Sequence, residues 1–186
     1  LARAANLYYP KTLKNPVNEK GNDVYKLDQM APLNGIKHDA HNAIGDVEAT
    51  IGIAKIISKK APNVWKASML TMDKNQSLEL IKSELLFCTN EYFYGRSRPY
   101  VQTFVCQHPQ YQWPLCFDLR HDPSPYLDMP LSELAASMKK QPKFIRTVRH
   151  NKHAIIMNPS YGNKFDEYKL IGTKKLEERA KKIRNN

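Results

Sequence analysis

A histidine and an aspartate five residues apart, His41 and Asp46, stand where an apolar periodic run begins. The run ends at two lysines before Pro62, so we expect one amphipathic helix over residues 43–60. On a regular helix the two side chains would point about 140° apart. They converge if His41 lies in the turn before the helix and Asp46 lies one turn inside it. Such a pair suits hydrolysis, because the imidazole takes a proton from water and the carboxylate holds a divalent cation.

The pattern His-x-Ala-x-x-Asp, read as His41, Ala43 and Asp46, resembles the third motif of the DnaQ-like (DEDDh) 3′→5′ exonucleases. The flanking sequences narrow the resemblance to the bacterial exonuclease I family. The matching segments run in order from about Arg3 to Met157, and they are 33–38, 47–51, His108-Pro109, Phe117-Asp118-Leu119 and 122–125.

The resemblance implies an enzyme that degrades single-stranded DNA from the 3′ end to nucleoside monophosphates with two Mg²⁺ ions. It implies that His41 is the general base and Asp46 a metal ligand. The family's first motif is Asp-x-Glu after an apolar strand, whereas the one Asp-x-Glu here, Asp46-Val47-Glu48, opens a helix. We therefore expect a fragment that lacks the first two catalytic carboxylates and is catalytically incomplete.

Two other interpretations remain open. The chain is alternatively a non-catalytic module that binds single-stranded DNA or another protein, with His41 and Asp46 inactive. The cluster His38, Asp39 and His41 also resembles the ligand pairs of all-helical HD phosphohydrolases. That reading needs further helical His and Asp ligands, and the β-rich second half offers no suitable context for them.

The chain of 186 residues carries 29 Lys and Arg against 18 Asp and Glu, a formal net charge of +11. This excess favours a polyanionic partner such as nucleic acid, although a merely solvated basic surface would give the same composition. The expected partners are single-stranded DNA and, from the resemblance, single-strand-binding protein. No apolar run approaches the about 20 residues that span a bilayer, so we expect no membrane partner. The three widely spaced cysteines, Cys88, Cys106 and Cys116, are expected to be free thiols in a reducing cytoplasm, and we expect a monomer.

The segment from Tyr92 to Tyr100 interleaves aromatic residues with arginines, the mixture that single-stranded DNA binders use for bases and phosphates. The competing interpretation is an ordinary sheet-edge hairpin. A second cluster of basic residues lies around residue 146. Two interpretations of it are open, a surface along which DNA binds and a basic face that is merely solvated. The predicted nucleic-acid-binding residues are Tyr92, Tyr94, Arg96, Arg98, Tyr100, Lys143, Arg146 and Arg149.

The helices and strands expected around these residues indicate an α+β fold. The buried face of the motif helix is expected at Ala43, Ile44, Val47, Ile51 and Ala54, with Glu48 exposed. Strands are expected at 100–106, 115–119, 144–148 and 154–157. The resemblance implies the C-terminal helical part of a ribonuclease H-like exonuclease domain (1–70), a helical connector (71–86), an SH3-like antiparallel β-barrel (87–169) and a basic helical tail (170–186).

Overall fold

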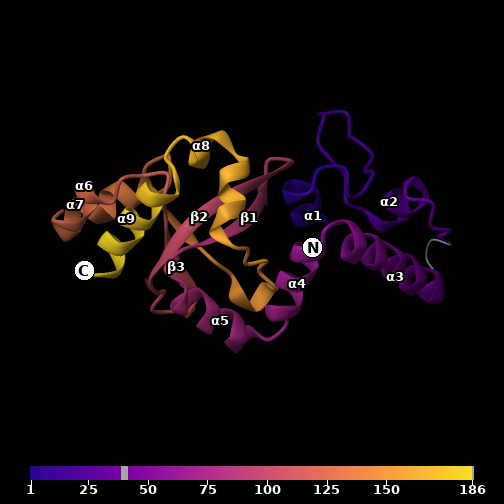
Figure 1. Ribbon diagram of the computed structural model, residues 1–186, viewed down its shortest axis with the longest axis horizontal. Helices are drawn as coiled ribbons and strands as arrows, with labels where there is room; N and C mark the ends of the chain where they lie inside the picture. The colour runs from indigo at the N-terminus through magenta and orange to yellow at the C-terminus, as the bar shows by residue number, and fades with distance from the viewer. Residues whose placement is uncertain (39–41, 186) are drawn as a thin grey trace. The chain divides into compact units, whose positions relative to one another are not determined.

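The computed structural model describes residues 1–38 and 42–185 (Figure 1). They form two compact units, the first made of residues 1–67 and 90–98 and the second of residues 68–89 and 99 onward. Helices combine with an antiparallel sheet, which confirms the expected α+β class. The predicted domain limits remain a prediction. None of the described helices is long and apolar enough to cross a membrane.

The first unit is mainly helical. Its helices are α1 (Ala2–Tyr8), α2 (Leu27–Leu33), α3 (Ala43–Lys60) and most of α4 (Pro62–Leu70). The α3 bounds match the prediction, because the Asn42 side chain accepts a hydrogen bond from the Ile44 N–H and caps the first turn. At the other end Pro62 begins the next helix.

The buried face of α3 differs from the prediction. The helix buries Gly45, Ala49, Ile53 and Ile57, which recur every four residues. The predicted face is largely in solvent, since Ile44, Val47 and Ile51 are 70%, 58% and 48% exposed. The predicted exposure of Glu48 is confirmed. Small residues allow other segments to approach α3 closely. At Gly52, for example, an added Cβ would lie only 2.9 Å from Cδ1 of Ile36.

Amide side chains hold the loops of the first unit. Asn34 ends α2, and its Oδ1 accepts from the Lys14 N–H (2.9 Å) while its Nδ2 donates to the Lys14 carbonyl (2.8 Å). Asn6 makes the same reciprocal pair with Leu13. Each side chain satisfies a backbone donor and acceptor as a neighbouring strand would, so the segment between α1 and α2 has a defined path.

The second unit is built on an antiparallel sheet. The strands of the chain are β1 (Phe87–Phe93), β2 (Arg96–Gln107), β3 (Pro114–Asp118) and β4 (Ile145–Thr147), hydrogen-bonded in that order. The tip of the β1–β2 hairpin, residues 90–98, belongs to the first unit. The helices of the second unit are α5 (Lys74–Ser83), α6 (Ser124–Leu127), α7 (Leu131–Lys139), α8 (Asp166–Lys169), α9 (Thr173–Arg184) and the 3₁₀ helices His150–Lys152 and Pro159–Lys164.

The sheet is open among the described residues. Strands were expected at 100–106, 115–119 and 144–148, and β2, β3 and β4 lie there. The fourth expected strand, at 154–157, is not formed, and a single antiparallel bridge joins Met157 to Cys88 of β1 instead. A closed SH3-like barrel is therefore not among the described strand pairings.

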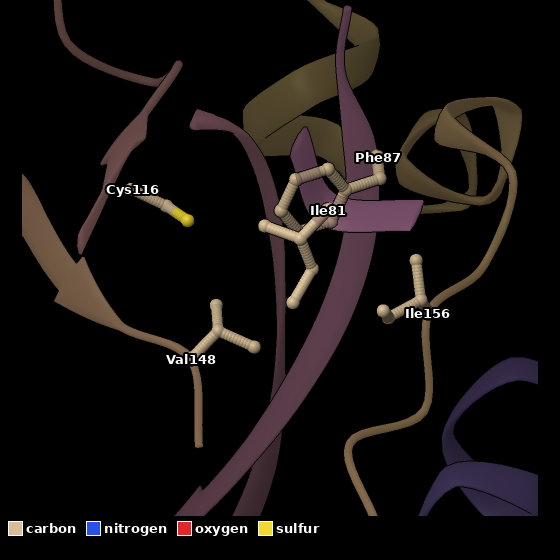
Figure 2. Close-up of a cluster of buried hydrophobic side chains, with 5 residues drawn as sticks. All are labelled: Ile81, Phe87, Cys116, Val148 and Ile156. Carbon is tan, nitrogen blue, oxygen red and sulfur yellow. The ribbon is translucent and has the colours of Figure 1, made fainter. Parts of the chain in front are cut away.

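The core of the second unit lies between α5 and the sheet. Side chains from α5, β1, β3 and the two segments after β4 converge there, as Figure 2 shows. They are Ile81, Phe87, Cys116, Val148 and Ile156. Burying apolar side chains of this size contributes about 1.5–3 kcal/mol each. This core includes Cys116 in the middle of β3 and Val148 directly after β4, so it anchors the segments next to the surface features described below.

Candidate functional site

Asp46 lies in the first turn of α3. Its backbone N–H donates to the Asn42 carbonyl (2.9 Å), and its carboxylate is 52% exposed. Unpaired N–H groups at a helix start carry partial positive charge, which favours a negative side chain there. The helix therefore presents to solvent the carboxylate that the sequence assigned as a metal ligand.

His38 contacts this carboxylate directly. Its Nε2 lies 2.6 Å from Asp46 Oδ1, and its side chain is only 3% exposed. Spacing in the sequence does not show which histidine a loop turns toward the helix, so this contact is not predicted from the sequence. The predicted general base, His41, lies outside the described residues.

These groups do not make a complete metal site. Within the described ranges, no three His, Cys, Asp or Glu side chains gather where they could hold a metal ion. Asp46 and His38 offer one carboxylate and one imidazole. A pair of Mg²⁺ ions needs several oxygen ligands. The described residues thus do not fit the expected pair of ions.

The tip of the β1–β2 hairpin presents one ring and two cations to solvent. Tyr94 and Gly95 form the turn, both with positive φ (50° and 74°), and Tyr94 is 91% exposed. Arg96 and Arg98 are also exposed. A Cβ at Gly95 would lie 2.0 Å from Asn22 Cγ, so glycine is needed for both space and conformation. This geometry suits the predicted contact with bases and phosphates.

Tyr92 has an anchoring position instead. The Arg3 guanidinium lies 3.8 Å from its ring centroid, and Tyr25 packs edge-on at 6.2 Å. Its hydroxyl donates to the Asp23 carbonyl (3.2 Å). The ring is therefore held inside the first unit beneath the hairpin tip.

The prediction for Tyr100 is corrected. Its ring is 1% exposed, with the guanidinium carbons of Arg146 and Arg120 at 3.6 and 4.9 Å from its centroid. A base cannot stack on a ring whose surroundings are already filled. Tyr94 lies in the exposed turn of the hairpin, whereas Tyr100 lies within β2, where it is buried. The aromatic-rich composition of the segment does not reveal this difference.

Arg146 is largely engaged inside the second unit, with only 15% of its side chain exposed. Its Nε lies 3.5 Å from the fully buried Asp118 carboxylate, and that carboxylate accepts hydrogen bonds from Arg120 Nη2 (2.6 Å) and from the Tyr168 hydroxyl (2.9 Å). Arg146 therefore belongs to an internal charge network. Lys143 and Arg149 are exposed and stay predicted DNA contacts.

Comparison with known proteins supplies the wider context. No protein-family profile matches the chain. A segment of 82 residues is 39% identical to exodeoxyribonuclease I of Buchnera aphidicola subsp. Acyrthosiphon pisum. The segment covers 44% of this chain and 20% of that protein. Exodeoxyribonuclease I of Escherichia coli (strain K12) is 31% identical over 80 residues, 42% of this chain and 17% of that protein. The resemblance to exonuclease I is therefore confirmed.

Solved exonuclease I structures share the fold of the whole chain. The protein from Methylocaldum szegediense aligns with a TM-score of 0.72 at 21% identity. E. coli exonuclease I in complex with a dA16 oligonucleotide aligns with a TM-score of 0.69 at 21% identity. An ExoI/SSB-Ct complex aligns with a TM-score of 0.67 at 20% identity. Each alignment covers 100% of this chain and 43% of the solved one. The chain thus spans less than half of these exonuclease I chains, and the matched segments span about a fifth of the curated relatives.

Proposed function

We propose that this chain is part of an exodeoxyribonuclease that degrades single-stranded DNA from the 3′ end to nucleoside monophosphates. The observation that carries the proposal is the 39% identity over 82 residues to exodeoxyribonuclease I. The half-exposed Asp46 carboxylate at the start of α3 supports it. A solved relative of the same fold holds a dA16 oligonucleotide, which supports single-stranded DNA as the substrate class.

In this proposal, His41 of the complete enzyme would accept the proton of the attacking water, and Asp46 would be one of the ligands of Mg²⁺. Two bound ions would stabilise the attacking and leaving oxygens of the phosphodiester. His38 would orient the Asp46 carboxylate through its hydrogen bond. Because the described residues contribute one carboxylate to this place, the chain by itself is proposed to be catalytically incomplete.

The proposed architecture follows the same relatives. Residues 1–70 would be the end of the nuclease domain, 71–86 a connector, 87–169 an SH3-like domain and 170–186 a basic helical tail. The antiparallel order of the four strands and the bridge between Cys88 and Met157 support the SH3-like assignment, since the bridge brings a later segment to the free edge of β1.

The proposed partners are single-stranded DNA and single-strand-binding protein. The second partner is supported by the solved ExoI/SSB-Ct complex, whose exonuclease has the fold of this chain. The formal charge of +11 suits both an oligonucleotide and an acidic protein segment. A cytoplasmic monomer remains the proposed state of the protein.

The first test uses the 186-residue chain alone. We expect no Mg²⁺-dependent digestion of a 5′-fluorescent single-stranded 30-mer, because one carboxylate cannot hold two cations about 3.5–4 Å apart. Robust 3′ digestion that Asp46→Ala abolishes would overturn the proposed incompleteness.

The second test uses the protein that the full reading frame encodes. We expect stepwise 3′ digestion of the same 30-mer, lost in Asp46→Asn because a neutral amide is a poor ligand for a hard cation. Glu48→Gln is the matched control, since Glu48 is exposed on the same helix and loses the same charge. His41→Ala should lower kcat by about 10²–10⁴-fold with little change in DNA affinity. Absence of digestion, with DNA binding retained, would favour the non-catalytic binding module.

A further inference from the structure

Three rings and a guanidinium form a continuous ladder at the turn between β2 and β3. The ring centroids of His108 and Tyr111 are 4.8 Å apart, and those of Tyr111 and Trp113 are 5.0 Å apart with an interplanar angle of 22°. The Arg149 guanidinium carbon lies 5.2 Å from the Trp113 ring centroid. We name His108, Tyr111, Trp113 and Arg149 the aromatic ladder.

The turn that carries the ladder is fixed by hydrogen bonds within it, to which the His108 ring itself contributes. The His108 N–H donates to the Trp113 carbonyl, and the Gln112 N–H donates to the His108 carbonyl, both at 2.8 Å. His108 Nδ1 accepts from the N–H groups of Gln110 and Tyr111 at 3.2 and 3.3 Å. The Gln107 amide also donates to the Gln112 carbonyl (3.0 Å). The rings are therefore presented on a rigid support, which lowers the entropy cost of binding.

The ladder remains at the surface. Tyr111 is 53% exposed, and His108 and Trp113 are only half-buried. None of the three contributes to the hydrophobic core beneath the sheet. The rings of Tyr111 and Trp113 already face their neighbours in the ladder, so a base would extend the ladder from its exposed parts. Exposed aromatic groups of this kind are those on which unpaired bases stack.

The charge beside the ladder is positive. Arg149 precedes the 3₁₀ helix His150–Lys152, which packs against α5. Burial, followed by the positive charges of Lys74 and Lys82, lowers the pKa of His150, so both α5 lysines lie close to this loop. The two segments that build the surface, 107–115 and 148–153, contain no Asp or Glu. A chain of phosphates would meet cations and no carboxylate from these segments.

We propose that the aromatic ladder is a binding site for single-stranded nucleic acid, on which bases stack while Arg149 and the lysines of α5 contact phosphates. The site is additional to the hairpin tip. It deepens the proposed function, on which it rests, by giving the second unit its own contact with the strand. The cations favour a nucleic acid over an uncharged proline-rich peptide, the other ligand that exposed aromatic rings accept.

The experiment is a titration of the 186-residue chain. In a Trp65→Phe background Trp113 is the remaining tryptophan, so its fluorescence reports on the ladder. We expect a 15-nucleotide oligo-dT to quench this emission. An abasic 15-mer, which keeps the phosphates, should bind at least about 5-fold more weakly and quench little, because losing even one stacked base weakens binding about 5- to 150-fold.

Variants separate the ladder from other contacts. Tyr111→Leu should weaken oligo-dT binding at least 5-fold, and Arg149→Gln should lower the salt dependence of binding. Tyr161→Leu is the matched control, because Tyr161 is half-buried in the same unit with Lys164 at 4.7 Å and lies outside the ladder. Far-UV circular dichroism checks that the variants fold.

Equal affinity of Tyr111→Leu and the parent chain, or equal quenching by abasic and normal strands, would overturn the ladder site. So would preferential binding of a proline-rich peptide over oligo-dT. The proposed function fails separately, through absence of digestion by the protein of the full reading frame. A chain whose binding is lost in Arg96→Ala/Arg98→Ala and untouched in Tyr111→Leu would keep the proposed function and lose the ladder.

Discussion

The contact between His38 and Asp46 joins a buried imidazole to a half-exposed carboxylate. The imidazole has a fixed place, so the 2.6 Å hydrogen bond holds one carboxylate oxygen and leaves the rest of the group toward solvent. Hydrogen bonds to charged groups are stronger than those between neutral ones, about 1.5–3 kcal/mol. We infer that His38 is a positioning residue for Asp46.

This inference predicts a selective defect. In the protein of the full reading frame, His38→Ala should lower kcat or apparent Mg²⁺ affinity about 10- to 100-fold, as removal of a group behind a metal ligand typically does. The KM for DNA should stay unchanged. His38→Gln should recover part of the loss, because its amide N–H can still donate to the carboxylate.

Kinetics at several Mg²⁺ concentrations make the measurement. A rise in KM equal to the fall in kcat would indicate that His38 contacts DNA. If His38→Gln is no better than His38→Ala, the hydrogen bond has no part in orienting Asp46.

Which individual residues the sequence could assign depended on their surroundings. Asp46 was found because its motif and its helix start are both local features. The surroundings of Tyr100 and Arg146 are not visible in the sequence, because Arg146 and Arg120 cover the Tyr100 ring and Asp118 of β3 pairs with Arg146. His108, Tyr111 and Trp113 were passed over because their stacking arises from a turn that spacing does not describe.

At the scale of elements, the β1–β2 hairpin divides its residues between support and contact. Tyr92 is held by Arg3 and Asp23, while Tyr94 and the two arginines reach solvent. Each phosphate contact to a single strand adds about 0.7 to the slope of log affinity against log salt. The number of arginines that touch DNA can therefore be counted from binding alone.

Arg96→Ala with Arg98→Ala should lower that slope by about 1.4 for the 186-residue chain and a short oligonucleotide. Tyr94→Ala should instead weaken binding at every salt concentration, because stacking does not release counterions. Fluorescence anisotropy from low to moderate salt measures both effects. Lys59→Ala with Lys66→Ala, two exposed lysines of the same unit, is the control of equal charge. An unchanged slope in the arginine variant would make the hairpin an ordinary sheet edge.

The helices show which part of the pattern was predictable. The end of α3 was predictable from Pro62, and the Asn42 cap that the structure shows at its start is an equally local feature. The buried face of α3 was not predictable. Gly45 and Ala49 are buried because they are small and allow close packing, whereas a ranking by hydrophobicity favours burial of Ile44 and Val47. The expected strand at 154–157 makes one bridge because pairing depends on a partner far away in the chain.

At the scale of the whole molecule, two histidines link stability to pH. Burial lowers the pKa of both His121 and His150. Nearby cations lower both further, and for His121 these effects outweigh the opposing charge of Asp118. In the unfolded chain a histidine titrates near about 6.5. As the pH falls below about 6.5, the unfolded state takes up protons before the folded state does. The contribution of these histidines to the free energy of unfolding is therefore fully present above about pH 6.5 and is lost on acidification.

We expect the urea midpoint to be lower at pH 5.5 than at pH 7.5, and the difference to shrink in His121→Gln with His150→Gln. Carboxylates titrate little in this interval. Unfolding followed by circular dichroism at both pH values measures the difference. The same difference in the parent chain and the double variant would show that these two histidines do not set it.

The outer face of α3 has a consequence for the behaviour of the purified chain. Ile44, Val47 and Ile51 share one helix face, and all three are in water. Contiguous exposed apolar surface promotes association. Despite the repulsion of a +11 charge, we expect reversible dimers in sedimentation at high salt, where repulsion is screened. Val47→Lys with Ile51→Lys should restore the monomer, whereas Thr50→Lys, which adds charge and keeps the apolar face, should not. Raising the ionic strength would then promote association of this chain while it weakens the binding of DNA.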